Sequence, residues 1–227
     1  VVDHYTYALC GDGCMMEGCT GEAASLAGTL ALDELVVFYD DNSISIEGST
    51  DLAFGEDVAA RFAAYNWRVI KVDNANDIAK CDAALAQAVE SDGRPTLIIG
   101  KTRIGFGAPN KEGKASAHGE PLGAEEVEAL RKHLNMPAEP FTVPQEVKEF
   151  CHARAEELEA QAADWEKRFE AFLEADSERA KLIYSFLNRT VPENIQDELL
   201  KVIDVSKPVA TRATSGAVLQ KAAELVP

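Results

Sequence analysis

An aspartate flanked by glycines and followed at a set distance by an asparagine constrains this chain more than any other feature. Gly11-Asp12-Gly13 follows the β-prone residues 5–9 after Cys10. Asn42 comes after the apolar run 35–39 and the two aspartates that end it. An Ala- and Leu-rich helical pattern lies between them. Two parallel strands joined by one helix end at the same edge of a sheet, where open α/β sheets bind ligands. We therefore expect Asp12 and Asn42 to lie close together.

The chemistry of this pair favours a hard cation. One carboxylate and one amide oxygen suit Mg2+, which takes few protein ligands and completes its oxygen shell with phosphate and water. Gly11 and Gly13 carry no Cβ that would obstruct a ligand, and the start of the following helix can offer amides to an anion. The pattern predicts a site for Mg2+ and a diphosphate. Gly-Asp-Gly alone is also typical of a tight turn with positive φ, and Asn42 is what favours the metal.

Strand and helix patterns alternate through about the first 135 residues. Helical spacing covers 57–65 and 77–90, the latter with Asp77 as N-cap, and apolar strands cover 67–72 and 96–100. Continuous apolar strands separated by amphipathic helices predict an α/β fold, a parallel sheet with helices on both faces. The dinucleotide fingerprint G-x-G-x-x-G is excluded because Met16 stands where its last glycine belongs.

Residues 101–123 interrupt this alternation. They hold five glycines and two prolines directly after a predicted strand. A loop of this length is usually functional or disordered, and its position at a strand end favours function. His118 lies in it among small residues, where its imidazole could face a ligand or simply be solvated. For the remaining histidines, His4, His133 and His152, surface or structural roles are the better interpretation.

The second half of the chain is predicted to hold a linker and a new unit. A proline-bearing segment, 136–144, ends the first domain, and long amphipathic helical spacing follows it. We expect a diphosphate- and Mg-binding α/β domain at 1–140, an acidic helical linker at 141–206 and the start of another domain at 207–227. Arg212 is expected just before a helix, with Thr211, Thr214 and Ser215 as candidate caps. An arginine there is typical of a surface pair.

Composition narrows the class of protein. A net charge of −17 argues against partners such as nucleic acid and anionic membranes, which need basic surfaces. No apolar run approaches the roughly 20 residues that span a bilayer. Five cysteines without a C-x-x-C pair fit neither a disulfide framework nor a zinc site, so a cytoplasmic location is expected, and an organelle form whose leader has been removed stays as the alternative. There is no initiator Met, and we expect an internal piece of a longer protein.

Longer strings of sequence resemble one family. GDG followed, after a helix and a strand, by Asn is similar to the thiamine diphosphate signature. The strings that resemble transketolase are GDGCMMEG, EAASLAGTL, YDDNSISIEG, KTRIGFGAPNKEG, AHGEPLG and ATRATSGAVL, and they extend over the whole chain.

The resemblance implies a thiamine diphosphate-binding fold and a transferase. Such enzymes move a two-carbon ketol unit from a ketose phosphate to an aldose phosphate, in the pentose phosphate pathway. They are homodimers that bind thiamine diphosphate and Mg2+, for which Ca2+ or Mn2+ could substitute, between the diphosphate domain of one subunit and the pyrimidine domain of the other. The chain would cover the later part of the first domain, the linker and the opening of the second, so alone it is expected to be inactive.

The resemblance also assigns roles to residues. Asp12, Asn42 and the backbone carbonyl of Ile44 would hold the metal, and Gly11, Gly13 and Asn42 would contact the cofactor. His118 would face cofactor and donor substrate as the catalytic residue, Arg212 would bind the substrate phosphate, and Glu17 would lie near the dimer interface. The N-terminal histidines, the glycine loop and the later cofactor-activating glutamate of the family are missing.

Two departures bear on the substrate. Ala117 stands where a serine commonly precedes the histidine, and Gly21 stands where many relatives carry histidine. These departures do not affect the implied assignment of the cofactor, but they weaken the assignment of a particular pair of sugar substrates. Dihydroxyacetone synthase, which shares the scaffold, therefore stays open. An interpretation from another class is a non-catalytic acidic interaction protein whose GDG is only a turn.

Overall fold

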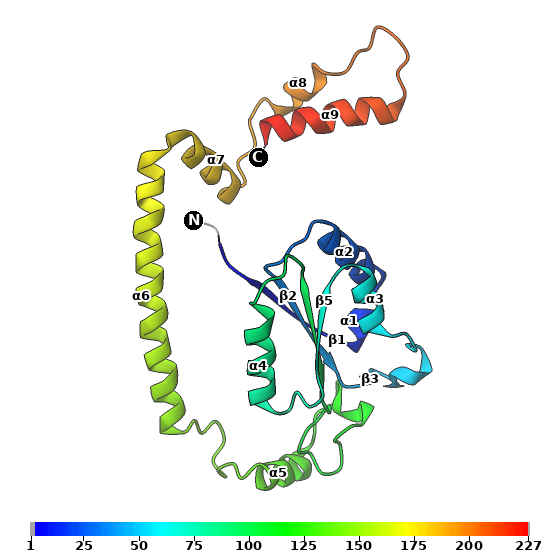
Figure 1. The fold of residues 1–227 in the computed structure, drawn as a ribbon, viewed down its shortest axis with the longest axis vertical. Coiled ribbons are helices and arrows are strands. Elements are labelled where there is room, and N and C mark those ends of the chain that lie inside the picture. The colour runs from blue at the N-terminus through cyan, green and yellow to red at the C-terminus, as the bar shows by residue number, and fades with distance from the viewer. Residues whose placement is uncertain (1–2, 227) are drawn as a thin grey trace. The chain divides into compact units, whose positions relative to one another are not determined.

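The chain divides into two compact units. The computed structural model describes residues 3–226, of which 3–142 form one unit and 143–226 the other (Figure 1). The further division of the second unit into a linker and a new domain stays a prediction.

A four-stranded parallel sheet is the centre of the first unit. Its strands are β1 (Thr6–Gly11), β2 (Leu35–Asp41), β6 (Thr96–Lys101) and β5 (Arg68–Val72), in the order β1-β2-β6-β5. The register sets Gly11 opposite Asp40 and Asp41 opposite Lys101. Because every pairing is parallel, the carboxyl ends of all four strands meet at one edge, as the sequence predicted.

Helices cover both faces of this sheet, which confirms the predicted fold class (Figure 1). On one face lie α1 (Asp12–Met16), α2 (Gly18–Thr29) and α3 (Val58–Ala64), and on the other lies α4 (Ile78–Ala88). The core under the first group is built from Met15, Ala24, Ala27, Tyr39, Val58, Phe62, Trp67, Leu97 and Ile99. The core under α4 contains Val36, Ile70, Val72, Ala84, Ala88 and Ile98.

Capping follows the sequence in this unit. Asp57 accepts a hydrogen bond from Ala60 N at 3.0 Å at the start of α3. Asp77 accepts one from Ala79 N at 3.0 Å at the start of α4, where it was predicted as N-cap. Each bond satisfies a backbone donor that the first turn of a helix leaves free.

A close approach fixes α2 on the sheet. The backbone of Gly28 lies so near the end of α3 that an added Cβ would stand 1.7 Å from Tyr65 O. The indole of Trp67 donates a buried 2.8 Å hydrogen bond to Ala24 O one turn earlier in α2. Glycine is therefore required at position 28 by packing.

The remaining elements of the first unit are short. After β2 come the antiparallel pair β3 (Ile44–Ser45) and β4 (Gly48–Ser49) and the 3-10 turn η1 (Thr50–Leu52), which the sequence did not predict. After β6 the chain runs through residues 102–123, with one 3-10 turn, η2 (Ala115–Ala117), into α5 (Ala124–His133). The predicted loop is therefore largely free of regular structure.

The second unit is helical. It consists of α6 (Gln145–Ala175), α7 (Ser177–Leu187), α8 (Ile195–Leu200) and α9 (Thr211–Leu225). The rings of Trp165 and Phe169 stack on α6 with their centroids 5.0 Å apart.

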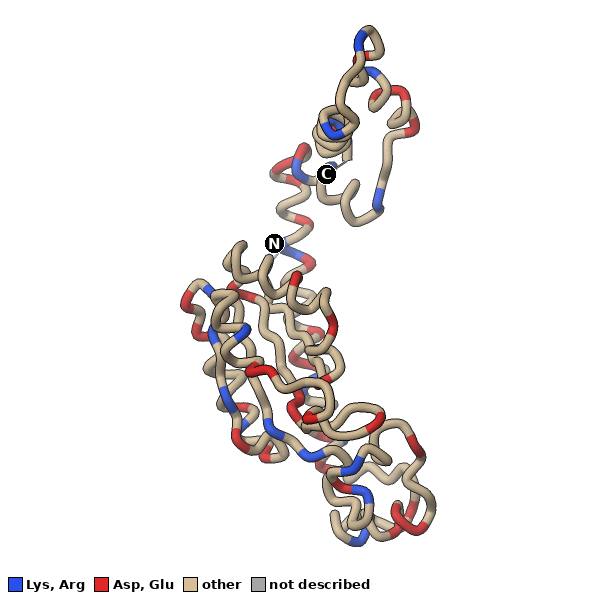
Figure 2. The backbone as a smooth tube through the Cα atoms, turned by 90° about the vertical axis from the view of Figure 1, so that its right-hand side faces the viewer, with Lys and Arg blue, Asp and Glu red and all other residues tan. Residues whose placement is uncertain are grey.

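Within residues 3–226 we find no helix long and apolar enough to cross a membrane. Basic and acidic positions are interleaved along the chain (Figure 2).

The start of α9 corrects one prediction. Arg212 lies in the first turn of α9, not before the helix, because the helix begins at Thr211. The residue at the N-cap position is Ala210, and no side chain caps this end, so the cap roles predicted for Thr211, Thr214 and Ser215 are wrong.

Candidate functional site

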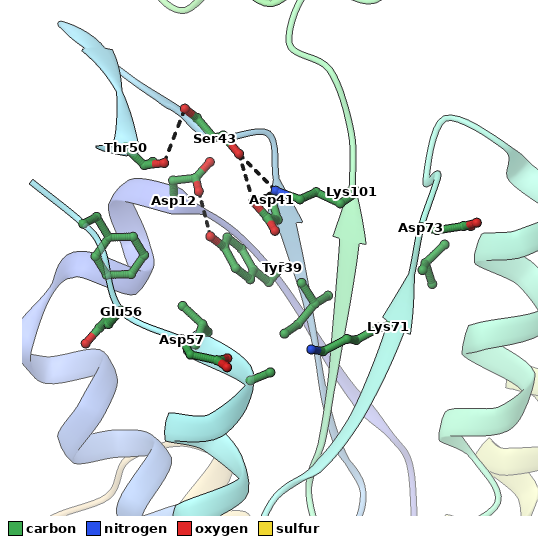
Figure 3. A pocket seen from close by; sticks show the side chains of 15 residues that line it. Asp12, Tyr39, Asp41, Ser43, Thr50, Glu56, Asp57, Lys71, Asp73 and Lys101 are labelled. Carbon is green, nitrogen blue, oxygen red and sulfur yellow. Dashed lines mark hydrogen bonds and ion pairs between the residues drawn. The ribbon is translucent and has the colours of Figure 1, made fainter. Parts of the chain in front are cut away.

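A cavity of about 470 Å³ opens at the carboxyl edge of the sheet (Figure 3). It is lined from the ends of β2, β5 and β6, from the start of α1 and from the loop before α3. Charged residues dominate its wall: the carboxylates are Asp12, Asp41, Glu56, Asp57 and Asp73, and the lysines are Lys71 and Lys101. With five carboxylates and two lysines, the cavity attracts cations, so a diphosphate would need a metal ion beside it.

Asp12 is the most buried of these carboxylates, at 3% exposed. Its Oδ1 accepts a 2.7 Å hydrogen bond from the Tyr39 hydroxyl, and its Oδ2 accepts a 3.3 Å bond from the backbone N of Asn42. Both donors are neutral, and within the described part of the chain no lysine, arginine or histidine forms an ion pair with it. A buried carboxylate without a positive partner is costly, and a bound metal ion is one of the ways proteins offset that cost.

Tyr39 acts on Asp12 only as a donor. Burial, and then the hydrogen bond to Asp12, raise the pKa of the Tyr39 phenol well above its ordinary value. The phenol therefore stays protonated and directs its hydrogen at the carboxylate (Figure 3). Its ring belongs to the core below the helices, so the bond links the core to the start of α1.

A tight turn brings Asn42 to this point. The Asn42 side-chain oxygen accepts a 3.0 Å hydrogen bond from Ile44 N, which closes a turn typical of asparagine. Between them Ser43 has φ of 63°, a left-handed conformation that non-glycine residues rarely adopt. Thr50 N holds this conformation by donating to Ser43 O at 3.0 Å. The predicted proximity of Asp12 and Asn42 is present, with Ile44 next along the turn.

Gly11 and Gly13 do not form the positive-φ turn that was the alternative interpretation. Gly11 has φ of −111°, and Gly13 is not among the glycines with positive φ. An added Cβ at either position would meet nothing within 4 Å. Neither backbone strain nor packing among the described residues requires glycine here, so the open space beside them is available to a ligand.

Lys101 is a site residue that the sequence reasoning missed. Its Nζ lies 2.9 Å from Asp41 Oδ1 and 3.0 Å from Ser43 Oγ, which joins the end of β6 to the turn after β2 (Figure 3). A lysine at the last position of a parallel strand was the available signal. Tyr39 was also missed, because it was assigned to the apolar strand without a polar role.

Two other predicted residues of the first unit, His118 and Glu17, do not line this cavity. His118 lies in the loop directly after η2 and does not line the cavity. Glu17 is exposed at the junction of α1 and α2 and lines a separate hollow with Gly18 and Gly21. Arg212 is exposed on α9 in the second unit. Within the first unit, the structure therefore gathers Gly11, Asp12, Gly13, Asn42 and Ile44 but leaves His118 and Glu17 outside the group.

The donor set limits how a metal could be held. Among residues 3–226 no group of three or more His, Cys, Asp and Glu side chains is arranged for a metal ion. A metal at Asp12 would rest on one carboxylate, amide and carbonyl oxygens, and oxygens of its own ligand. That set suits Mg2+, which commonly binds through one or two carboxylates and substrate phosphates.

Comparison with known proteins identifies the family. Residues 1–192 match the family described as transketolase, thiamine diphosphate binding domain. The chain belongs to the transketolase family. It is 44% identical over its whole length to the plasmid-encoded transketolase of Cupriavidus necator and 42% identical to the transketolase of Geobacillus stearothermophilus. It covers 34% of each of these proteins.

Solved structures of the family share its fold. Transketolase from Leishmania mexicana superposes with a TM-score of 0.86 at 35% identity, covering 100% of the chain and 33% of that protein. The Pichia stipitis enzyme in complex with sedoheptulose 7-phosphate superposes with a TM-score of 0.85 at 38% identity, covering 99% of the chain and 33% of that enzyme. The predicted family and fold are confirmed, and the chain spans about a third of the length of these relatives.

Proposed function

We propose that the chain forms the Mg2+- and diphosphate-binding part of a transketolase, which moves a two-carbon ketol unit from a ketose phosphate to an aldose phosphate. The observation that carries this proposal is the buried Asp12 carboxylate beside Asn42, without a positive partner among the described residues, at the ligand-binding edge of a parallel sheet. The match of residues 1–192 to the thiamine diphosphate binding domain of transketolase supports the proposal.

Asp12, Asn42 and the carbonyl of Ile44 would hold Mg2+, and Mn2+ or Ca2+ could take its place. Tyr39 orients the Asp12 carboxylate through Oδ1. The bond from Asn42 N to Oδ2 fixes the spacing between strand and turn. The metal would neutralise the acidic cavity where the cofactor diphosphate enters.

Gly11, Gly13 and Asn42 would lie against the diphosphate of thiamine diphosphate. The space beside both glycines is open, which permits close approach of the backbone. Lys101 lies at the same edge and forms an ion pair with Asp41. When bound, thiamine diphosphate supplies the carbon chemistry of ketol transfer, and the protein supplies binding, orientation and proton transfer.

Substrate roles fall to His118 and Arg212 in this proposal. His118 would face the cofactor and the donor, and Arg212 would bind the phosphate of the sugar. Structures of the Pichia stipitis relative contain xylulose 5-phosphate, sedoheptulose 7-phosphate and fructose 6-phosphate. Because the chain covers about a third of its relatives, the rest of a homodimeric, cytoplasmic enzyme of the pentose phosphate pathway would complete the site, with Glu17 near the dimer interface.

The test is ketol transfer by the full-length protein that carries these residues. We expect activity with a ketose phosphate donor and an aldose phosphate acceptor, lost when either thiamine diphosphate or Mg2+ is omitted. The purified 227-residue chain should show none. Full activity without the cofactor would contradict the proposal, and so would ketol transfer by the chain alone. A strong preference for an unphosphorylated acceptor would favour the dihydroxyacetone synthase alternative.

A further inference from the structure

The segment that carries His118 depends on side chains for its shape. We name residues 102–123 the His118 loop; its one regular element is η2, immediately before His118. The imidazole of His118 forms no hydrogen bond or ion pair with the described residues, and its backbone N bonds to Ala115 O at 2.8 Å. The position of the imidazole is therefore set by the backbone of the loop.

Glu126 of α5 holds the loop at one point. This glutamate is 7% exposed, the most buried carboxylate of α5. Its Oε1 accepts a 2.7 Å hydrogen bond from Asn110 N, and its Oε2 accepts a 2.8 Å bond from Asn110 Nδ2. The side-chain and backbone hydrogen bonds from Asn110 lower the pKa of Glu126, so it stays an ionised, two-pronged acceptor at neutral pH.

Lys111, the next residue, extends this support to His118. Its Nζ donates to Pro121 O at 3.1 Å and reaches Ser116 O at 3.5 Å. Ser116 and Pro121 lie on either side of His118 in the chain. The side chain of Lys111 is only 22% exposed, and its bond to Ser116 O is partly buried, where a hydrogen bond is stronger than on the open surface.

We propose that Glu126 and Lys111 are positioning residues for His118, with Glu126 fixing Asn110 and Lys111 bracing the carbonyls on both sides of the histidine. This inference rests on the proposed substrate role of His118. A side chain on a loop loses catalytic value when it samples many positions, and supporting hydrogen bonds limit that loss. Neither residue contacts the cavity at Asp12, so cofactor affinity should be independent of them.

The test is a double-mutant cycle in the full-length holoenzyme. Glu126→Ala should lower kcat/KM by about tenfold, the equivalent of about 1.4 kcal/mol, because Asn110 loses both acceptors. In a protein that already carries His118→Ala, the same change should cost less than about twofold, because residues that act through one another are not additive. Within each background, Glu126→Ala should leave thiamine diphosphate affinity unchanged.

Two further variants serve as controls. Glu126→Gln should keep kcat/KM within about threefold, because the introduced amide and the amide of Asn110 can turn to restore both hydrogen bonds. Glu125→Ala should leave kcat/KM unchanged, because Glu125 is exposed at the neighbouring position of the same helix and its side chain forms no hydrogen bond or ion pair within residues 3–226. If Glu126→Ala fails to fold by circular dichroism, Lys111→Met in the same two backgrounds decides the matter.

The outcomes distinguish a failure of the positioning role of Glu126 and Lys111 from a failure of the proposed role of His118. If Glu126→Ala lowers kcat/KM by the same factor with and without His118, the positioning role is overturned and the proposed role of His118 stays intact. Unchanged activity of His118→Ala by itself would overturn both. A loss confined to thiamine diphosphate affinity would show that Glu126 supports the cofactor site instead, which also contradicts the inference.

Discussion

The hydroxyl of Tyr39 donates a 2.7 Å hydrogen bond to Oδ1 of Asp12. This bond connects the middle of the buried core to the first residue of α1, between two side chains 27 positions apart in the sequence. It fixes one oxygen of a carboxylate whose other oxygen accepts from the turn after β2. Both oxygens of Asp12 are therefore oriented by the fold before any ligand arrives, which reduces the cost of ordering a metal site.

Tyr39→Phe tests this orientation. The ring keeps its packing, but Asp12 loses a donor, so we expect Mg2+-dependent affinity for thiamine diphosphate to fall about tenfold, on the scale of a charged hydrogen bond. Titration calorimetry of the full-length protein at saturating Mg2+ measures it. Tyr5→Phe is the matched control, because the Tyr5 hydroxyl donates to Val89 O at 3.0 Å. Equal affinities for the two variants would contradict the role given to Tyr39.

Gly28→Ala tests the packing of α2. A methyl group 1.7 Å from Tyr65 O forces the helix and the end of α3 apart, and we expect the free energy of unfolding to fall by about 3 kcal/mol or more. Urea unfolding followed by circular dichroism measures it. Gly18→Ala, in the same helix with nothing within 4 Å of the added carbon, should have no destabilising effect. Similar unfolding midpoints for both variants would contradict the packing.

Cys10, near the end of β1, should be an unreactive thiol. Burial is the main cause that raises its pKa to about 12, so it carries no thiolate at neutral pH. Iodoacetamide at mildly alkaline pH should alkylate the exposed Cys14, Cys19 and Cys151 and spare Cys10, as read by peptide mass spectrometry. Alkylation of Cys10 at the rate of the other three would show that the strand end opens readily.

The same shift predicts alkaline sensitivity. Above the ordinary thiol pKa of 9.0 the unfolded chain releases a proton that the folded chain keeps until about 12. The unfolded state then binds fewer protons, so the free energy of unfolding falls as pH rises through this window. For Cys10→Ala, the free energy of unfolding should fall less steeply over the same pH window. Identical slopes for the two proteins would contradict the burial of this thiol.

Arg212→Ala tests the proposed phosphate contact. A sugar phosphate is a dianion near neutral pH, and guanidinium engages its oxygens in pairs. We expect KM for a phosphorylated donor to rise about 10- to 100-fold, the scale of a charged hydrogen bond, with a smaller effect on kcat. KM for unphosphorylated hydroxypyruvate should not change. Equal losses on both donors would mean that Arg212 supports the fold or the cofactor.

Much of the candidate site was predictable, for a definite reason. The proximity of Asp12 and Asn42 follows from parallel strands alone, because their carboxyl ends share one edge. The left-handed Ser43 and the β3–β4 pair that follows were not predicted, because the polar–apolar alternation of residues 43–46 is too short to distinguish a two-residue strand from a loop. The link from Tyr39 to Asp12 was missed because apolar patterning assigns a tyrosine to the core without saying what its hydroxyl meets.

Other errors have local causes. The start of α9 was misplaced because capping preferences favour serine and threonine, and this helix begins after Ala210 without a side-chain cap. The path of the His118 loop depends on hydrogen bonds such as that from Asn110 to Glu126, 16 positions away. Hydrophobic periodicity in the sequence does not predict such a contact. The roles of His118, Glu17 and Arg212 stay predictions.

The most direct test of the metal and diphosphate site is calorimetric titration of full-length Asp12→Asn with thiamine diphosphate, with and without Mg2+. Asparagine keeps the size of the side chain but removes the charge that the metal requires. Asp73→Asn is the control, because Asp73 lines the same cavity but is exposed and pairs with Lys80 at 2.7 Å. We predict that Asp12→Asn loses Mg2+-dependent binding by more than about 100-fold, beyond the scale of a single hydrogen bond, while Asp73→Asn binds nearly normally. Unchanged affinity and unchanged Mg2+ dependence in folded Asp12→Asn would contradict the assignment.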